Sequence, residues 1–369
     1  MRRYVVVLAL VVTACSQPAG KQVETATVSP SQSVSPVASP SPDIPLSTVD
    51  FSCRLPVIRS ATFGNFKGGF VTFPAATFAP DPRGVMTSNN QNGVLTTAAS
   101  PALSGSLSFA GPPFYDAAQH RWVPVGPGQS TPDGSFYAYA TWDPAKPDRS
   151  VVHVVDVAKA ADRVFYIAMP VQAMGFNVAD FNSLGVYLVF NRTIEQFPDG
   201  VWLMDPASGA LRQLPQVSLV EAVRGGLAWL AKIDPGDPMP PQLPRSGTPS
   251  DSLISVDLVS GTTQTWFYRP GRQVSLMGFD SRGRPIVDVF DPSGLNDSSE
   301  KWLIAGPGNE VLLYGGAVDL EVPQGDGSRI WFGGYSGIYL YTASHGLQKV
   351  AAFNDLHAGE SVLPAGMCG

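Results

Sequence analysis

Residues 255–268 have the sequence SVDLVSGTTQTWFY, in which two runs of strand-favouring residues flank a short polar turn. Asp257 opens the turn, where its carboxylate can accept a hydrogen bond from a backbone amide two residues later. Gly261 closes it, and an aromatic run from Trp266 to Tyr268 follows. This stretch predicts a tight β-hairpin.

The hairpin pattern recurs along the chain as an aromatic-rich strand, a tight turn and a second strand. Copies lie at 114–123, 154–165 and 202–214, and weaker ones lie at 303–314 and 339–350. Successive turns are roughly 36 to 52 residues apart, which is the length of one four-stranded propeller blade. The repeat therefore predicts an all-β domain folded as a β-propeller.

Three strings carry a resemblance to known families. Residues 132–140, PDGSFYAYA, resemble the blade entry of TolB-type and WD-repeat-like β-propellers. The strings GGFVTFP at 68–74 and WFGGY at 331–335 are similar to secreted bacterial propellers of unassigned function. The resemblance implies the fold and carries over no active-site residue.

The turns delimit six blades, although five or seven also fit the spacing. The expected bounds are 53–125, 126–168, 169–216, 217–270, 271–316 and 317–369. The first and last blades are irregular, as they would be if strands from the two ends of the domain share a blade and close the ring. The rival fold is a pair of β-sandwich domains, which explains the strands but not a repeat of about 45 residues.

Composition also favours short strands and tight turns. Gly and Pro occur 37 and 34 times, which leaves little room for helices of ordinary length. Asp, which favours turns, occurs 23 times, and Glu, which favours helices, occurs 7 times. A hydrophobic content of 44% is enough for a substantial core. The net charge of −6, without a basic cluster, argues against nucleic-acid binding.

Residues 1–14 have the pattern of a secretion signal. Two Arg residues precede an apolar run that is too short to span a bilayer as a helix. The end of this run, VTAC at 12–15, resembles the lipobox of bacterial lipoproteins, whose Cys is joined to diacylglycerol. The resemblance implies lipidation of Cys15 and an extracytoplasmic chain anchored at the outer surface of the membrane. The alternative is an ordinary cleaved signal in which Cys15 is incidental.

Residues 15–50 are expected to be a disordered Ser/Pro-rich stalk. Ten of the fourteen residues at 29–42 are Ser or Pro, and no aromatic residue occurs between Ser16 and Asp50. Such a segment cannot bury enough apolar surface to offset the entropy of ordering it. The stalk would carry the propeller domain of residues 51–369 clear of the membrane.

Cys53 and Cys368 remain once Cys15 is lipidated, and they lie at the two ends of the folded region. We expect a disulfide between them because exported proteins meet an oxidising environment, with two free buried thiols as the alternative. The bond requires Cα atoms about 4–7 Å apart. A ring-shaped fold brings its ends that close.

The sequence contains no nucleophile elbow, phosphate-binding loop or zinc-protease motif. The four His residues are scattered and each fits a structural role: His120, His153, His345 and His357. The acidic stretch at 288–300 has enough oxygens for a calcium ion, although a solvated turn explains it equally well. We expect no catalytic residue, no cofactor and no metal beyond this calcium alternative.

The seven Trp residues occur about once per blade and are expected mainly to fill the space between blades. The alternative is an aromatic-lined ligand face. Two long loops, at 87–104 and 234–251, are expected to line such a face.

Two functions fit these features. The first is a monomeric, lipid-anchored binding or scaffold module for a peptide, a glycan or an envelope protein. The second is an extracytoplasmic hydrolase or lyase with carboxylates in the central channel of the propeller. The sequence favours binding and leaves catalysis open. Two carboxylates or a His–Asp pair converging in the channel would favour the enzyme.

Overall fold

The hairpin predicted at 255–268 is present as β17 (Ser252–Asp257) and β18 (Thr263–Tyr268). The Asp257 carboxylate accepts hydrogen bonds from the amides of Val259 (2.9 Å) and Ser260 (2.7 Å). The turn therefore forms through the side-chain-to-backbone bonding that its sequence predicts.

The computed structural model describes residues 44–61, 65–89, 94–97, 100–106, 111–142, 148–168, 175–190, 200–215, 217, 220–232, 250–292 and 299–369. The predicted signal peptide, Cys15 and the stalk as far as residue 43 lie outside these ranges. Within them the one helical element is the 3-10 helix η1 (Pro127–Gln129). Among these same residues no helix has the length and apolar character needed to cross a membrane.

Four consecutive blades have four antiparallel strands each, in chain order. The third blade contains β11 (Phe176–Asn182), β12 (Gly185–Phe190), β13 (Val201–Met204) and β14 (Leu211–Gln213). The fourth contains β15 (Val220–Arg224), β16 (Leu227–Lys232), β17 and β18. The fifth contains β19 (Gln273–Phe279), β20 (Pro285–Phe290), β21 (Ser299–Gly306) and β22 (Asn309–Gly316). The sixth contains β23 (Glu321–Asp326), β24 (Arg329–Gly333), β25 (Gly337–Thr342) and β26 (Gly346–Ala352).

The second blade has three regular strands, β8 (Phe136–Trp142), β9 (Arg149–Asp156) and β10 (Ala161–Ala168). Ser130 forms an isolated antiparallel bridge with Tyr137 on β8. The Thr131 amide also donates to the Phe136 carbonyl at 2.8 Å. The short segment after η1 therefore takes the place of the first strand.

The first blade closes the ring with strands from both ends of the domain, as expected. It contains β1 (Cys53–Ala61), β2 (Asn65–Phe73) and β3 (Thr77–Asn89), and β27 (Ser361–Pro364) pairs with β1 in antiparallel register. We call it the closing blade. The prediction that residues 361–364 belong to the sixth blade is wrong, because their strand partner is β1.

Covalent and hydrogen bonds hold this seam together. A disulfide joins Cys53 and Cys368, whose Cα atoms are 5.5 Å apart, as the sequence predicts. The Arg54 amide donates to the Gly369 carbonyl at 2.8 Å. On β24, a Cβ at Gly333 would overlap the carbonyl oxygen of Val362, so glycine allows the sixth blade to approach β27.

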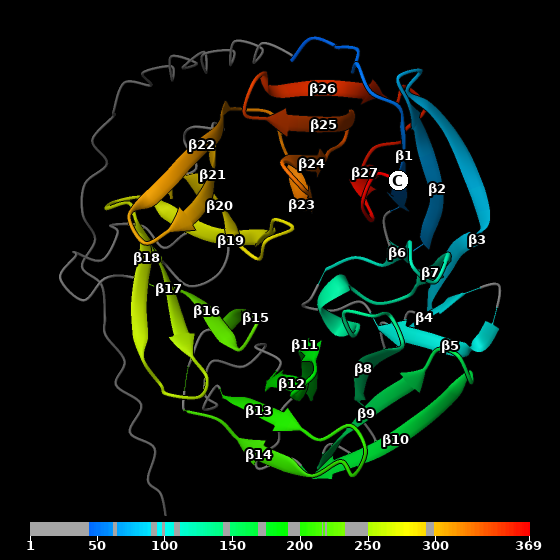
Figure 1. The fold of residues 1–369 in the computed structure, drawn as a ribbon, viewed down its shortest axis with the longest axis vertical. Helices are drawn as coiled ribbons and strands as arrows, with labels where there is room; N and C mark the ends of the chain where they lie inside the picture. Colours follow the sequence, from blue (N-terminus) through cyan, green and yellow to red (C-terminus); the bar gives the residue numbers. More distant parts are fainter. Residues whose placement is uncertain are drawn as a thin grey trace, which may run out of the picture. The chain divides into compact units, whose positions relative to one another are not determined.

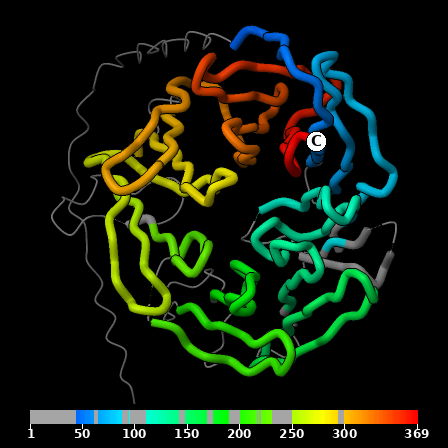
Figure 2. Tube along the Cα trace, viewed as in Figure 1, coloured from blue at the N-terminus to red at the C-terminus, as the bar shows by residue number. Residues whose placement is uncertain are grey.

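The unit of residues 41–369 is a ring of six blades (Figure 1). The strands β11, β15, β23 and β27 lie nearest the centre, and β14, β18, β22 and β26 lie at the rim. Figure 2 shows the blue segment that forms β1 beside the red C-terminal end of the chain, at the closing blade. Six blades, rather than five or seven, is therefore the number this chain adopts.

The prediction of a loop at 87–104 is wrong for the residues that the structure describes. β3 continues to Asn89, and β4 (Val94–Thr97) and β5 (Ser100–Ser106) extend the same sheet. Polar residues form strands here because their backbones pair with the edge of the blade, with Met86 opposite Thr97. The predicted hairpin at 114–123 exists as β6 (Phe114–Asp116) and β7 (Arg121–Val123), but it is a separate two-stranded sheet.

Ordered structure begins inside the segment assigned to the stalk. Leu46 forms a parallel bridge with Lys349 on β26, and the Ser47 amide donates to the Lys349 carbonyl at 2.8 Å. Val49 is buried in a core cluster of the closing and sixth blades, and Ile44 packs against another cluster. The boundary expected at residue 50 is therefore too late, because these apolar side chains cover the sixth blade.

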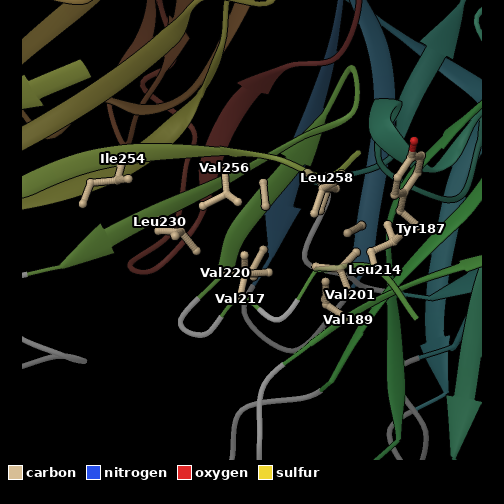
Figure 3. Packing of buried hydrophobic residues seen from close by; sticks show 13 residues of the cluster. Tyr187, Val189, Val201, Leu214, Val217, Val220, Leu230, Ile254, Val256 and Leu258 are labelled. Carbon is tan, nitrogen blue, oxygen red and sulfur yellow. The ribbon is translucent and has the colours of Figure 1, made fainter. Parts of the chain in front are cut away.

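Apolar side chains from neighbouring blades meet in separate core clusters. Figure 3 shows the cluster of the third and fourth blades, where Tyr187 and Val189 come from one blade and Leu230, Ile254 and Val256 from the other. Because blades cover a sheet on both faces, β17 is buried over nearly its whole length. The rim strand β18 is mostly exposed.

The Trp residues pack between and within blades, as expected. Trp122, Trp229 and Trp331 are buried, and Trp202, Trp266 and Trp302 are partly buried against core clusters. The Trp142 side chain lies outside the described residues. These six side chains are part of the core, so they do not form the aromatic ligand face that was the alternative.

Candidate functional site

The blades have two edges that differ in how strands are connected. In the fourth blade, the turns after Arg224 and after Asp257 lie together, because the Leu258 amide donates to the Gly226 carbonyl at 3.0 Å. We call this the turn edge. The opposite edge, which we call the connection edge, carries described links such as residues 334–336 between β24 and β25, and residues 269–272, 317–320 and 353–360 from one blade to the next.

The ends of the closing-blade strands meet at the connection edge. Ser60, near the end of β1, lies opposite Ser361, the first residue of β27. The link from β26 to β27, residues 353–360, therefore runs beside the point where β1 leads into β2. Segments nearly 300 residues apart are brought together here by ring closure.

A polar pocket of about 240 Å³ lies at this point. Its lining comes from β1, β2 and the link before β27: Arg59, Asn65, Lys67, Asp355, His357 and Glu360. Three of these side chains are basic or potentially basic and two are acidic. The pocket is thus a site of mixed charge, suited to hydrogen bonding and ion pairing.

Arg59 organises the acidic side of the pocket. Its Nη1 donates to Asp355 Oδ2 at 2.8 Å, and its Nη2 lies 3.6 Å from Glu360 Oε2. The Arg59 side chain is 18% exposed, whereas that of Asp355 is 70% exposed. The hydrogen bond from Arg59 holds the pKa of Asp355 below its usual value, so this carboxyl group is ionised at neutral pH.

The remaining polar side chains of the pocket are uncommitted, by which we mean that they form no hydrogen bond or ion pair with a described residue. No described residue forms a hydrogen bond or an ion pair with the side chains of Asn65, Lys67 or His357, all of which are exposed. The His357 amide donates to Glu360 Oε2 at 3.1 Å, which shapes the turn before β27. The pocket therefore presents an ammonium, an amide and an imidazole to a ligand.

Carboxylates at the turn edge bond to side chains of the turns in which they lie. Hydroxyl groups of Thr131 (2.6 Å) and Ser135 (2.7 Å) donate to Asp133 and lower its pKa to about 2. Lys159 lies 2.8 Å from Asp156 and lowers the pKa of that carboxyl group. These acids stabilise local structure and offer no site comparable to the pocket.

Carboxylates on the innermost strands each have a separate partner. Asp180 lies 3.7 Å from Arg224 and accepts from Asn182 at 2.9 Å, and burial raises its pKa. Glu221 accepts from the Leu276 amide at 3.1 Å. In the described strands these acids bond to bases, amides and backbone, the contacts expected of structural carboxylates.

A His–Asp pair is present, but in the second blade. His153 Nδ1 lies 2.8 Å from Asp162 Oδ2, and its ring stacks on Tyr139 with centroids 4.4 Å apart. The pair joins β9 to the rim strand β10, away from the innermost strands. His120 lies in the turn between β6 and β7, and His345 bonds to Ser344 in the turn before β26.

The stretch offered as a calcium alternative is divided between strands and a link. Asp288 lies within β20 and pairs with the buried Lys301 at 2.8 Å, and Glu300 accepts from Trp302 Nε1 at 2.9 Å. Residues 293–298 lie outside the description, as do residues 233–249 of the second long loop. Among the described residues, no group of three His, Cys, Asp or Glu side chains could hold a metal ion.

The sequence did not indicate the pocket. Of its residues, only His357 was considered, and then as a structural residue. Arg59 and Asp355 are 296 residues apart, and neither sits in a motif. The signal that was available is topological: a closed ring places the end of β1 beside the link that precedes the last strand.

Comparison with known proteins finds distant structural likenesses and no match in sequence. No family model matches the sequence, and no curated protein matches it. TolB from Acinetobacter baumannii is similar at 13% identity and a TM-score of 0.42, over 87% of this chain and 65% of that one. The β-propeller domain of the Trilobed protease from Pyrococcus furiosus is similar at 12% identity and a TM-score of 0.42, over 82% of this chain and 86% of that domain. A prolyl endopeptidase is similar at 13% identity and a TM-score of 0.43, over 85% of this chain and 50% of that one.

This chain thus spans less than two thirds of the length of TolB and half that of the prolyl endopeptidase. At these identities and TM-scores the likenesses carry no conclusion about the function of this chain.

Proposed function

We propose that this chain is an extracytoplasmic lipoprotein, anchored through Cys15, whose propeller binds a peptide, glycan or protein of the cell envelope. The pocket at Arg59 carries the binding role, because uncommitted polar side chains line a recess there. The lipobox-like sequence at 12–15 motivates the anchor. The Cys53–Cys368 disulfide fits an oxidising compartment.

The closing blade is suited to hold a binding site in a fixed geometry. β1 and β27 are joined by strand pairing, and the disulfide links Cys53, the first residue of β1, to Cys368, which follows β27 in the chain. Pocket residues on β1 and β2 are therefore held against those of the link before β27. Binding groups on links that are positioned by a rigid scaffold are a common arrangement in proteins.

The anchor is tested by acylation in a bacterial host. We expect the full chain to incorporate a labelled fatty acid and to sediment with membranes. Cys15→Ser should abolish labelling and release the chain, whereas the Cys53→Ser variant should remain labelled. Labelling that survives in Cys15→Ser would contradict lipidation at this residue.

The binding role is tested against catalysis with the same purified chain. We expect it to retain peptide or glycan fragments of the host envelope and to show no turnover in a panel of esterase and glycosidase substrates. Robust turnover that Asp180→Asn or Glu221→Gln abolishes would overturn the binding role in favour of a channel enzyme. Glu310→Gln, which alters a carboxylate on the rim strand β22, is the control.

A further inference from the structure

Two cations lie side by side in the pocket. Arg59 on β1 is directly opposite Lys67 on β2, so their side chains emerge on the same face of the sheet. Like charges directly opposite each other in an antiparallel pair are destabilising. The pairing of each cation with the acids of the pocket therefore decides which of the two is available to a ligand.

The two acids of the pocket engage Arg59 and leave Lys67 unpaired. Asp355 and Glu360 approach the guanidinium at 2.8 Å and 3.6 Å. Within the described chain, no carboxylate lies within ion-pair distance of the Lys67 ammonium. The positive charge of Lys67 is therefore available to an anionic group.

The uncommitted groups favour a ligand with an acceptor at one end and a donor beside it. Lys67 and the amide of Asn65 supply N–H donors on the β2 side. Asp355 is largely exposed and keeps acceptor capacity beyond its bond to Arg59. A peptide C-terminus has this pattern, because the backbone N–H of its last residue lies two bonds from the carboxylate carbon.

The volume and charge of the pocket limit the classes of ligand that it can bind. At about 240 Å³ it is smaller than the roughly 300–1,000 Å³ of sites that enclose a small molecule, so it suits the end group of a longer ligand. A phosphate group carries about two negative charges and would be repelled by Asp355 and Glu360. A ligand with a single carboxylate carries one negative charge, which matches the one unpaired ammonium of Lys67 and is repelled less than a phosphate.

We propose that this pocket binds the C-terminal carboxylate of a peptide, with Lys67 pairing the carboxylate and Asp355 accepting from the adjacent backbone N–H. The proposal rests on the binding function proposed above and specifies its ligand class. Arg59 is a positioning residue, since it holds Asp355 and Glu360 in place. His357 and Asn65 border the carboxylate position.

The test uses the full chain in detergent micelles and three probes in titration calorimetry. The probes are acetyl-trialanine with a free carboxylate, the same peptide with a terminal carboxamide, and inorganic phosphate. We expect the carboxamide to bind at least about tenfold more weakly than the acid, because a charge-assisted bond is lost. Lys67→Gln should weaken binding of the acid by a similar factor.

Lys159→Gln is the matched control, because Lys159 is an exposed lysine of the turn edge. It should leave binding unchanged. The Tm of each variant is measured as well. Lys67→Gln should retain or raise the Tm, since it removes the repulsion with Arg59. A lower Tm would contradict the strained arrangement of cations from which the proposal starts.

Several outcomes overturn the proposal. Equal binding of acid and carboxamide, no binding of either, or undiminished binding by Lys67→Gln would each do so, and tighter binding of phosphate than of the acid would reassign the site to phosphate. Retention of envelope fragments by Lys67→Gln would leave the proposed binding function standing while this inference fails. Absence of retention by the unaltered chain would remove the binding function as well.

Discussion

The closing blade and the fourth blade share an antiparallel strand order, but their strands come from different parts of the chain. β15 to β18 are contiguous within residues 220–268. In the closing blade, β27 pairs with β1, so that Arg59 lies opposite Val362. The contacts of the fourth blade are local in sequence, whereas those of the closing blade form only when the ring is complete.

This difference matters because the pocket lies in the closing blade. Arg59 and Lys67 come from its first two strands, and Asp355 and Glu360 come from the link before its last strand. Ring closure and pocket assembly are therefore the same event. Any change that releases β27 from β1 should remove the acidic side of the pocket while the fourth blade remains intact.

The largest effect is expected from a matched pair of Trp substitutions on second strands. Trp331 on β24 packs against Phe73 of the closing blade, with centroids 5.4 Å apart, whereas Trp229 on β16 packs against Trp266 at 4.9 Å. Trp331→Ala and Trp229→Ala should each reduce the free energy of unfolding by about 3–5 kcal/mol, because both rings are buried.

Hydrogen exchange distinguishes the two variants. Trp331→Ala should reduce the protection of amides in β27 and β1 more than that of β16 and β17, and Trp229→Ala should do the reverse. Denaturant titration measures the global loss. Identical exchange patterns in the two variants would show that the closing blade has no stability of its own, and the comparison would then fail.

The disulfide should have the next largest effect. Replacing both Cys53 and Cys368 by Ala should lower the free energy of unfolding by about 2–5 kcal/mol, since the bond constrains a long loop in the unfolded chain. Exchange should increase first in β27, and affinity for the acid peptide should fall with it. Cys15→Ser keeps the disulfide and is the control. Undiminished affinity in the double variant would separate pocket assembly from ring closure.

Sequence rules succeeded where structure depends on neighbouring residues. The turns after Asp156, Asp205 and Asp257 were predicted because a short side chain bonds amides two or three residues away, and the structure has these bonds. The disulfide was predicted because two Cys residues of an exported chain usually pair in an oxidising environment, and the closed ring brings them together. Both inferences need only local chemistry or one global constraint.

Sequence rules failed where a residue's partner is distant. Sharing of a blade by the two ends was expected, but the predicted bounds of the sixth blade, 317–369, include the strand at 361–364, because nothing in its sequence identifies β1 as its partner. The polar stretch at 87–104 predicts a loop, but strands form at 94–97 and 100–106 because their backbones pair with the edge of a blade formed by distant residues. The pocket was not predicted for the same reason. Arg59 and Asp355 become neighbours only through the topology of the ring, so no sequence motif marks them.

The smallest effect is expected at a turn-edge carboxylate. The folded pKa of Asp133, about 2, lies below its unfolded value of about 3.9. The ionised carboxylate therefore stabilises the fold above about pH 4, and this contribution is lost as the pH falls through 2. Because Asp133 is exposed to solvent, Asp133→Asn should cost less than about 1 kcal/mol at pH 5.

The pH dependence sharpens the comparison of the two blades. Unfolding midpoints of Asp133→Asn and the unaltered chain should differ at pH 5 and converge at pH 2, and the extra exchange at pH 5 should be confined to the turn before β8. Asp355→Asn should instead increase exchange in β27, because Arg59 loses an ionised partner beside the seam. If Asp133→Asn also loosened β27, the turn edge and the closing blade would be coupled, and the view that blades with local contacts are stabilised independently of the seam would have to be abandoned.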